Sequence, residues 1–217
     1  MERKTIATCV LLLLIIAAAA TSLFFRRPGG SPRINLNPYH ALGAVAAEET
    51  SKLLGDGGTI VIVINDPGDE RDSVLEAQLG TFTRTLNKLG KFAVDAVERI
   101  KMNAMTRMAT GGAMPPEQFA AIRAKHPRAD AFVLFIGFPM LPPNELNTLK
   151  AGKTKLIVIS AALPGYRELL STGIIQLAIV PKPGTANEDT LEPKNLRDWF
   201  SREYQIVTPA TAELLPF

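Results

Sequence analysis

The sequence of 217 residues is 47% hydrophobic, carries a formal net charge of +3 and contains one cysteine. This length allows one domain with a substantial core and a short appendage. The charges are mixed and dispersed, without the basic, aromatic-rich stripe typical of nucleic-acid binding, so we expect no nucleic-acid partner. Cys9 lies in the apolar N-terminal segment, which leaves the rest of the chain without a disulfide or a thiolate metal site.

The N-terminal segment is predicted to enter a membrane. Residues 5–25 are uncharged and have basic residues on both sides, and about 20 apolar residues span a hydrocarbon core of about 30 Å. We interpret residues 1–26 as an uncleaved anchor, because the apolar run continues past the small residues 18–20. Those small residues also fit the cleavage site of a signal peptide, which is the alternative. The first interpretation predicts a single-pass inner-membrane protein with its domain in the periplasm, and the second a secreted protein.

The predicted domain begins after a short linker. Residues 27–37 contain the proline, glycine and serine typical of a linker, and residues 38–217 form the domain. A helix is expected over residues 38–54, where Gly55 ends it. The run TIVIVI at residues 59–64 has six β-branched residues and no charge, which is typical of a central strand covered on both faces.

The next segment is the clearest amphipathic helix of the sequence. Its apolar positions are three or four residues apart: Leu75, Leu79, Phe82, Leu86 and Leu89. Ser73 is predicted to cap its N-terminus, and Gly90 to end it.

A strand nearer the sheet edge and an ambiguous segment follow. Residues 92–100 alternate apolar and polar side chains, as in a strand with one solvated face. Residues 101–112 contain Met102, Met105 and Met108 at helical spacing. We interpret these methionines as packing residues rather than as metal or redox groups.

The remaining sequence alternates helices and apolar strands. Helices are expected over residues 115–126, 144–150 and 164–171, and strands over residues 131–136, 156–159, 174–180 and 204–208. A last helix, before the final strand, is expected to turn Leu196, Trp199 and Phe200 inward. Buried strands alternating with helices predict an α/β fold with a doubly wound, mostly parallel, Rossmann-like sheet.

The order of these segments resembles a known family. The stretches that carry the resemblance are HALGAVAAEETSKLLGDGGTIVIV, QLGTFTRTLNKLG, AIRAKHPRADAFVLFIGFP, KLIVIS and STGIIQLAIVPKP. Together they resemble the C-terminal lobe of type I periplasmic sugar-binding proteins, a lobe shared with the ligand domain of LacI-like repressors. The resemblance implies a solute-binding-like domain related to ABC transport. Family members close two lobes on a sugar, whereas this chain has room for one, so a homodimer would supply the second lobe by symmetry.

Several positions depart from what the resemblance implies. Ala77 stands where the family usually has an arginine, and Phe138 where a polar residue commonly follows the second buried strand. The expected aspartate falls within residues 160–162 and the expected glutamine at Pro181. The groups that usually hold the sugar are therefore missing.

The predicted ligand site lies at the carboxyl ends of the parallel strands, where open α/β sheets bind their ligands. Six residues follow these strands and are the candidate ligand-binding residues: Asn65, Asp66, Asp69, Gly137, Phe138 and Ser160.

Other chemistries are less well supported by the residues. The acidic residues 66–72 match no metal-binding loop and fit a turn and a helix N-terminus, where carboxylates are favourable. A receiver-like phosphorylation site would need an aspartate where Gly137 stands. His40 and His126 are expected to be cap or surface residues, and no nucleophile-elbow pattern is present. We therefore predict no catalytic residue, no metal, no cofactor and no enzymatic activity.

These observations predict a membrane-anchored, extracytoplasmic solute-binding-like domain, with carbohydrates as the candidate solutes. The alternative is a tethered interaction module of the same fold that has no ligand. In that case the apolar loop of residues 138–143 marks the surface for a protein partner.

Overall fold

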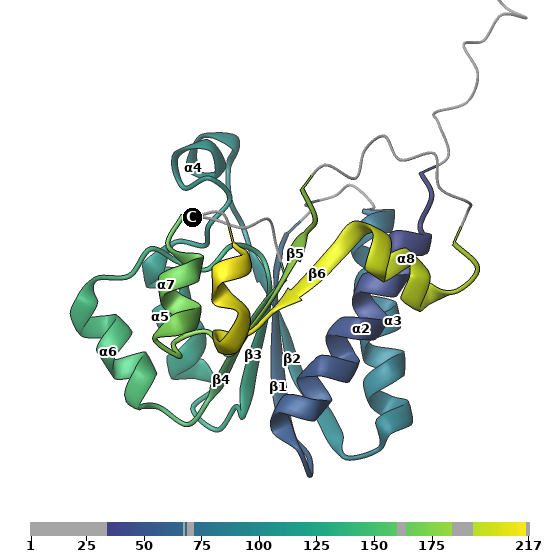
Figure 1. Cartoon of the computed structure of the whole chain (residues 1–217). Coiled ribbons are helices and arrows are strands. Elements are labelled where there is room, and N and C mark those ends of the chain that lie inside the picture. Colours follow the sequence, from purple (N-terminus) through teal and green to yellow (C-terminus); the bar gives the residue numbers. More distant parts are fainter. Residues whose placement is uncertain (1–33, 67, 69–71, 160–163, 184–192, 216–217) are drawn as a thin grey trace, which may run out of the picture. The chain divides into compact units, whose positions relative to one another are not determined.

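A six-stranded sheet organises the chain (Figure 1). The computed structural model describes residues 34–66, 68, 72–159, 164–183 and 193–215. Within it, Leu36–Phe217 forms one compact unit. The predicted membrane segment lies outside the described residues. None of the helices in the described ranges has the length and hydropathy needed to cross a membrane.

The strand order is β2-β1-β3-β4-β5-β6. The first five strands are parallel, and β6 pairs with β5 in antiparallel orientation. Their bounds are β1 Gly58–Asn65, β2 Phe92–Ile100, β3 Ala131–Phe135, β4 Lys155–Ile159, β5 Leu177–Pro181 and β6 Tyr204–Val207. The predicted mostly parallel α/β sheet is therefore confirmed, with β2 at its edge.

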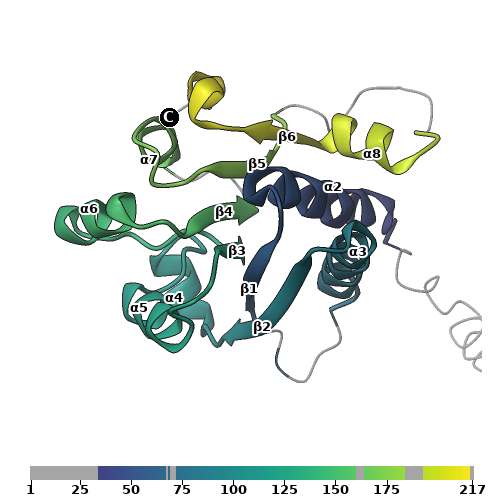
Figure 2. The same cartoon turned by 90° about the horizontal axis from the view of Figure 1, so that it is seen from below.

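Helices cover both faces of this sheet (Figures 1 and 2). One face packs against α2 Asn37–Leu54, α3 Ser73–Leu89 and α8 Leu196–Glu203. The other packs against α5 Pro116–Lys125, α6 Pro143–Ala151, α7 Tyr166–Ser171 and the short 3₁₀ helix η2 Pro209–Leu214. The sheet is thus doubly wound.

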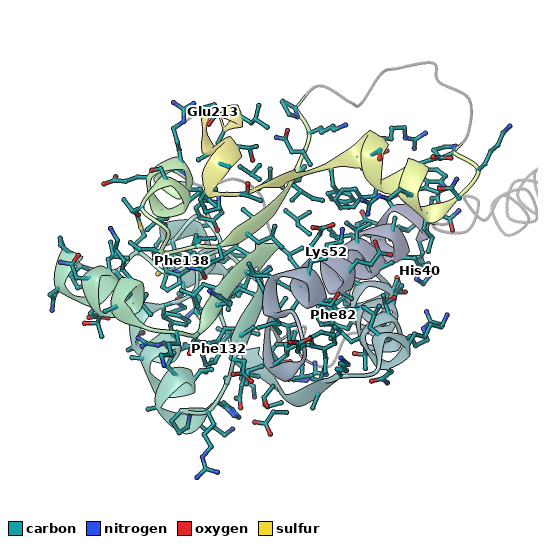
Figure 3. All side chains as sticks on the ribbon, turned by 60° about the horizontal axis from the view of Figure 1, so that its bottom comes forward. His40, Lys52, Phe82, Phe132, Phe138 and Glu213 are labelled. Carbon is teal, nitrogen blue, oxygen red and sulfur yellow. The ribbon has the colours of Figure 1, made fainter. Side chains whose placement is uncertain are left out.

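The central strand β1 explains why two cores form. Ile60, Ile62 and Ile64 belong to the core under α2 and α3, while Val61 and Val63 belong to the core under α5 and α7. All five side chains are fully buried, as expected for a strand covered on both faces. Figure 3 shows the two cores on either side of the sheet, with Phe82 in one and Phe132 in the other.

A β-bulge changes the face that β2 presents to each core. Ile60 pairs with Val94, but Val61 pairs with Ala96, so Asp95 is an extra residue. Phe92 and Val94 consequently pack in the core under α3. Ala96 packs in the core under α5. The regular alternation in the sequence therefore conceals a switch of faces.

Two polar side chains differ from their predicted roles. The N-cap of α3 is Asp72 rather than Ser73, and its Oδ1 accepts hydrogen bonds from the backbone N–H groups of Val74 and Leu75 at 3.0 Å each. His40 lies within α2 rather than before it, and its Nδ1 is 2.9 Å from Thr81 Oγ1 on α3. This contact joins two helices, so His40 is neither a cap nor a simple surface residue.

Two apolar predictions were also wrong. The helix α4 Ala104–Ala109 has no buried residue, and its Met105 and Met108 are 81% and 84% exposed. Only Met102 among these methionines packs against the core. Leu196 is 40% exposed, whereas Trp199 and Phe200 are buried as predicted.

Candidate functional site

The site predicted from the sequence lies where the winding of the sheet reverses. After the carboxyl end of β1, the chain passes to α3 on one face of the sheet. After the carboxyl end of the neighbouring strand β3, it passes to α6 on the opposite face. Two adjacent strands whose connections leave toward opposite faces form the topological switch point at which open α/β sheets bind ligands.

Asn65 and Asp66 stand at the end of β1 at this switch point. The Asp66 backbone N–H donates to Ile100 O at 2.8 Å, and Asp66 Oδ1 accepts from the Gly68 N–H at 3.1 Å. Asn65 Oδ1 is buried and has no hydrogen-bond partner among the described residues. A buried acceptor without a partner costs about 1–3 kcal/mol, which a bound donor would offset.

Gly137 and Phe138 follow β3 but contribute differently. Gly137 is held by backbone hydrogen bonds to residues 112 and 114 and forms an isolated bridge with Ala113. The side chain of Phe138 is 2% exposed and packs edge-on against Phe119. The Phe138 N–H donates to the Tyr166 hydroxyl at 2.9 Å. Phe138 therefore lies in the core under α5 and α7, and a contact of its side chain with a ligand at the edge stays a prediction.

The remaining two candidate residues, Asp69 and Ser160, lie outside the described residues. The structure therefore brings together the ends of β1 and β3 at the switch point. The contributions of the loops around residues 69 and 160 stay predictions.

A groove that the sequence indicated only in part lies between α6 and α7. Its volume is about 620 Å³, and most of its lining is apolar, both typical of ligand pockets. The loop of residues 138–143 contributes Phe138, Pro139, Met140 and Leu141, as its apolar sequence suggested. The contributions of α7 and of residues 109–113 were missed. We call this feature the α6–α7 groove.

Both helices present a regular stripe to this groove. The α6 stripe is Pro143, Leu146, Asn147 and Lys150, and the α7 stripe with its N-cap is Gly165, Glu168, Leu169 and Thr172. Each set has the i, i+3, i+4, i+7 spacing of a single helix face. This spacing defines one face on each helix in the sequence, but it does not indicate that the two faces share a groove.

A cluster of charged side chains and a histidine connects α5 to the edge strand β2. His126, at the C-terminus of α5, has its Nδ1 3.0 Å from Asp95 Oδ2 and its Nε2 2.7 Å from Glu98 Oε1. Lys125 Nζ also lies 2.7 Å from Glu98 Oε1. Hydrogen bonds from Lys125 and His126 hold the pKa of Glu98 below its ordinary value of 4.5. Asp95 is the extra residue of the β2 bulge.

The described residues contain no group of three or more histidine, cysteine, aspartate or glutamate side chains that could hold a metal ion. His126 contacts both Asp95 and Glu98, and Lys125 contacts Glu98, which explains the proximity of these side chains.

Comparisons with known proteins identify the architecture. No family model matches the sequence, and no curated protein matches it. Solved structures do match: an arabinose-binding protein from Geobacillus stearothermophilus has a TM-score of 0.54 at 15% identity, over 81% of this chain and 62% of that protein. A solute-binding protein of an ABC transporter from Burkholderia graminis, in complex with D-arabinose, has a TM-score of 0.57 at 18% identity, over 82% and 61%.

The chain has the fold of a periplasmic-binding-protein lobe. A sugar-binding protein of a sugar ABC transporter from Bacillus halodurans agrees, with a TM-score of 0.52 at 15% identity over 82% of this chain and 63% of that protein. The resemblance predicted from the segment order is thus confirmed at the level of the fold. The chain spans about three fifths of the length of the sugar-binding proteins that it matches.

Proposed function

We propose that this chain is an extracytoplasmic solute-binding domain without catalytic activity, held at the membrane by residues 1–26 and related to ABC transport proteins. Its ligand is a small polar solute, with carbohydrates as the candidate class. The observation that carries the proposal is the buried, unpaired Oδ1 of Asn65 at the switch point, in a fold that sugar-binding proteins share.

The chemistry of this edge suits a ligand that donates hydrogen bonds. An amide oxygen and a carboxylate both accept hydrogen bonds from hydroxyl groups, and Asn65 and Asp66 supply one of each in adjacent positions. A sugar presents several hydroxyls at once. For the opposing surface of the site, we propose a second copy of this chain, with the two edges face to face.

A second candidate function is a tethered interaction module without a solute. The observations that favour it are the replaced sugar-holding positions. Ala77, where the resemblance implies an arginine, is buried in α3, and the side chain of Phe138 is buried in the core. In that case, a protein partner would bind the apolar surface that the loop of residues 138–143 contributes to the α6–α7 groove.

Thermal unfolding of residues 36–217 with a panel of monosaccharides tests the first function. A ligand at a hundred times its Kd stabilises the native state by about 2.7 kcal/mol, which raises the Tm of a domain of this size by roughly 5–10 °C. We expect a rise with one sugar and not with its epimers. Asn65→Ala should abolish the rise, whereas Asn87→Ala, at an exposed position of α3, should preserve it. A flat response across the panel would reject solute binding and favour the interaction module.

A further inference from the structure

Among the described residues that line the α6–α7 groove, two carry a charge. Lys150 on α6 and Glu168 on α7 are the charged residues of its lining. Within the described part of the chain, neither side chain forms an ion pair or a hydrogen bond, with the other or with a third residue. An unpaired cation and an unpaired anion therefore face one apolar groove from two different helices.

The two charges lie at different depths along the groove. Both helices run from the carboxyl edge of the sheet toward its amino edge, since each follows one parallel strand and precedes the next. Lys150 is seven residues beyond the start of the α6 stripe, which is about 10 Å at 1.5 Å per residue, whereas Glu168 is three residues beyond the start of the α7 stripe, about 4.5 Å. Counted from the start of its own stripe, Lys150 therefore lies farther along its helix than Glu168 does, and Leu146 and Leu169 also belong to the stripes.

We propose that the α6–α7 groove binds a short apolar peptide with free termini. The terminal ammonium group is held by Glu168, the terminal carboxylate by Lys150, and the apolar side chains by Leu146 and Leu169. Three extended residues span about 10 Å, and the groove volume of about 620 Å³ lies in the range of small-ligand pockets. This site is separate from the Asn65 edge and does not depend on the proposed solute binding.

Charge complementarity selects this occupant over others. A purely apolar molecule would leave both charges without a partner, and a molecule with a single negative charge would be repelled by Glu168. A zwitterion with an apolar body satisfies both charges and the lining together. The exposed Met140 at the rim suits variable side chains, because methionine is flexible and polarisable.

Calorimetric titration of the purified full-length protein with trileucine tests the proposal. We expect saturable binding of trileucine. Lys150→Ala should weaken this binding about two- to fivefold, because it removes one exposed ion pair. The same variant should bind trileucine amide as the parent protein does, because that peptide lacks the carboxylate. Glu168→Gln should likewise weaken trileucine but not N-acetyl-trileucine.

Matched variants separate the groove from general effects. Asn147→Trp places a large side chain at an exposed lining position of α6 and should abolish binding. Asn144→Trp, exposed on the same helix but outside the lining, should not. Lys153→Ala, just beyond α6, controls for net charge, and Asn65→Ala should leave trileucine binding unchanged. Absence of binding at millimolar trileucine, or equal loss with both tryptophan variants, would overturn the proposal.

Discussion

At the scale of single residues, His126 has the most informative environment. Its Nδ1 lies 3.0 Å from Asp95 Oδ2 and its Nε2 lies 2.7 Å from Glu98 Oε1. Lys125 Nζ also contacts Glu98 Oε1, at 2.7 Å. Because α5 and β2 meet through these side chains, the cluster contributes to the stability of the sheet edge.

The first prediction concerns the pH dependence of this cluster. The pKa of Glu98 is lowered in the folded protein, so the unfolded chain binds the proton more readily. The stabilisation by Glu98 is therefore present above pH 4.5 and is lost as the pH falls through the folded pKa. Glu98→Gln should lower the free energy of unfolding by about 0.5–1 kcal/mol at pH 7. Denaturant unfolding at pH 7 and pH 3 should show a smaller difference from the parent at pH 3 than at pH 7. Glu117→Gln, at an exposed position of α5, should show no such dependence, and an equal effect in both variants would contradict the prediction.

Tyr204 provides the second prediction, at alkaline pH. Burial, with the charges of Tyr39 and Glu203 nearby, raises the pKa of Tyr204 from 10.0 to about 12. The unfolded chain then loses this proton first, so stability is complete below pH 10 and is lost as the pH rises toward 12, by up to about 1.4 kcal/mol per pH unit. Tyr204→Phe should lose less stability than the parent between pH 10 and pH 11.5 in urea unfolding. Parallel losses in the two proteins would refute this account.

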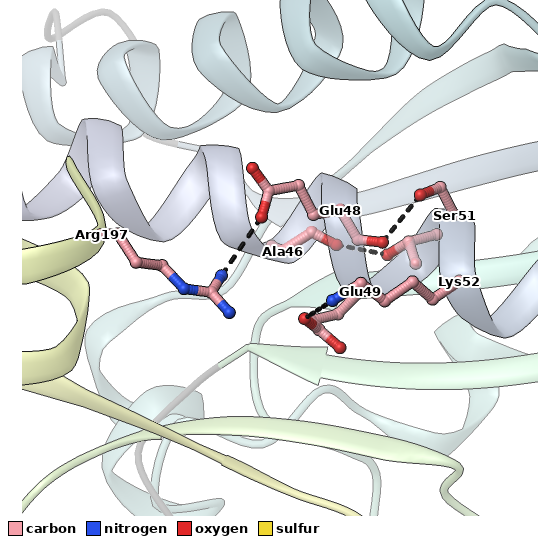
Figure 4. Close-up of polar contacts among 7 residues, drawn as sticks. Ala46, Glu48, Glu49, Ser51, Lys52 and Arg197 are labelled. Atoms are coloured by element: carbon pink, nitrogen blue, oxygen red, sulfur yellow. Dashed lines mark hydrogen bonds and ion pairs between the residues drawn. The ribbon is translucent and has the colours of Figure 1, made fainter.

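At the scale of elements, the packing of α2 against α3 depends on a close approach at Gly43. A Cβ placed there would lie 2.2 Å from the backbone oxygen of Gln78, and a backbone atom in a packed helix cannot move as the end of a side chain can. At another position of α2, Glu48 Oε2 lies 3.2 Å from Arg197 Nη1 of α8 (Figure 4).

Substitutions at two helical glycines give the third prediction. Gly43→Ala should destabilise the protein by about 1–3 kcal/mol, the usual cost of overpacking. Gly80→Ala is the matched control, because a Cβ at Gly80 in α3 has no neighbour within 4 Å. Alanine is the better helix former by about 0.8–1.0 kcal/mol, so this variant should be as stable as the parent or more so. Chemical denaturation of both variants measures the difference, and two effects of the same sign would contradict the close approach.

The sequence predicted elements better than their details, for identifiable reasons. The strands β1 and β3 were recognisable because burial on both faces demands uncharged, apolar runs. The bulge at Asp95 was not recognisable in the sequence, because residues 92–100 keep a regular alternation while the pairing shifts. The exposure of α4 was not recognisable either, because methionines at helical spacing occur both in helices that pack on a core and in helices that do not.

The candidate site was predictable only as a location. The order of elements placed Asn65 and Gly137 at one edge, but whether a side chain such as Phe138 faces that edge depends on the direction of the chain after β3. The α6–α7 groove required two helices to present stripes to each other, which tertiary structure alone decides.

At the scale of the whole molecule, the proposed membrane tether determines how the lobe would meet its binding partners. A binding-protein lobe that is held at a membrane would encounter partners and second copies in two dimensions. That is the arrangement in which weak pairing of incomplete sites becomes effective. The interpretation of residues 1–26 as an anchor therefore bears on both proposed functions.

The last prediction tests that anchor. The full-length protein should stay in the membrane fraction after an alkaline carbonate wash, and its intact mass should include residues 1–26. Leu13→Arg places a charge in the middle of the apolar run, at a cost to insertion of about 2.5–3.5 kcal/mol, and should release the protein, whereas Leu13→Ile should not. A mature N-terminus immediately after residue 20, with the protein in the soluble fraction, would instead establish a cleaved signal peptide. The two copies of the proposed pair would then meet by diffusion in solution, and pairing would have to show a dependence on bulk protein concentration in sedimentation experiments.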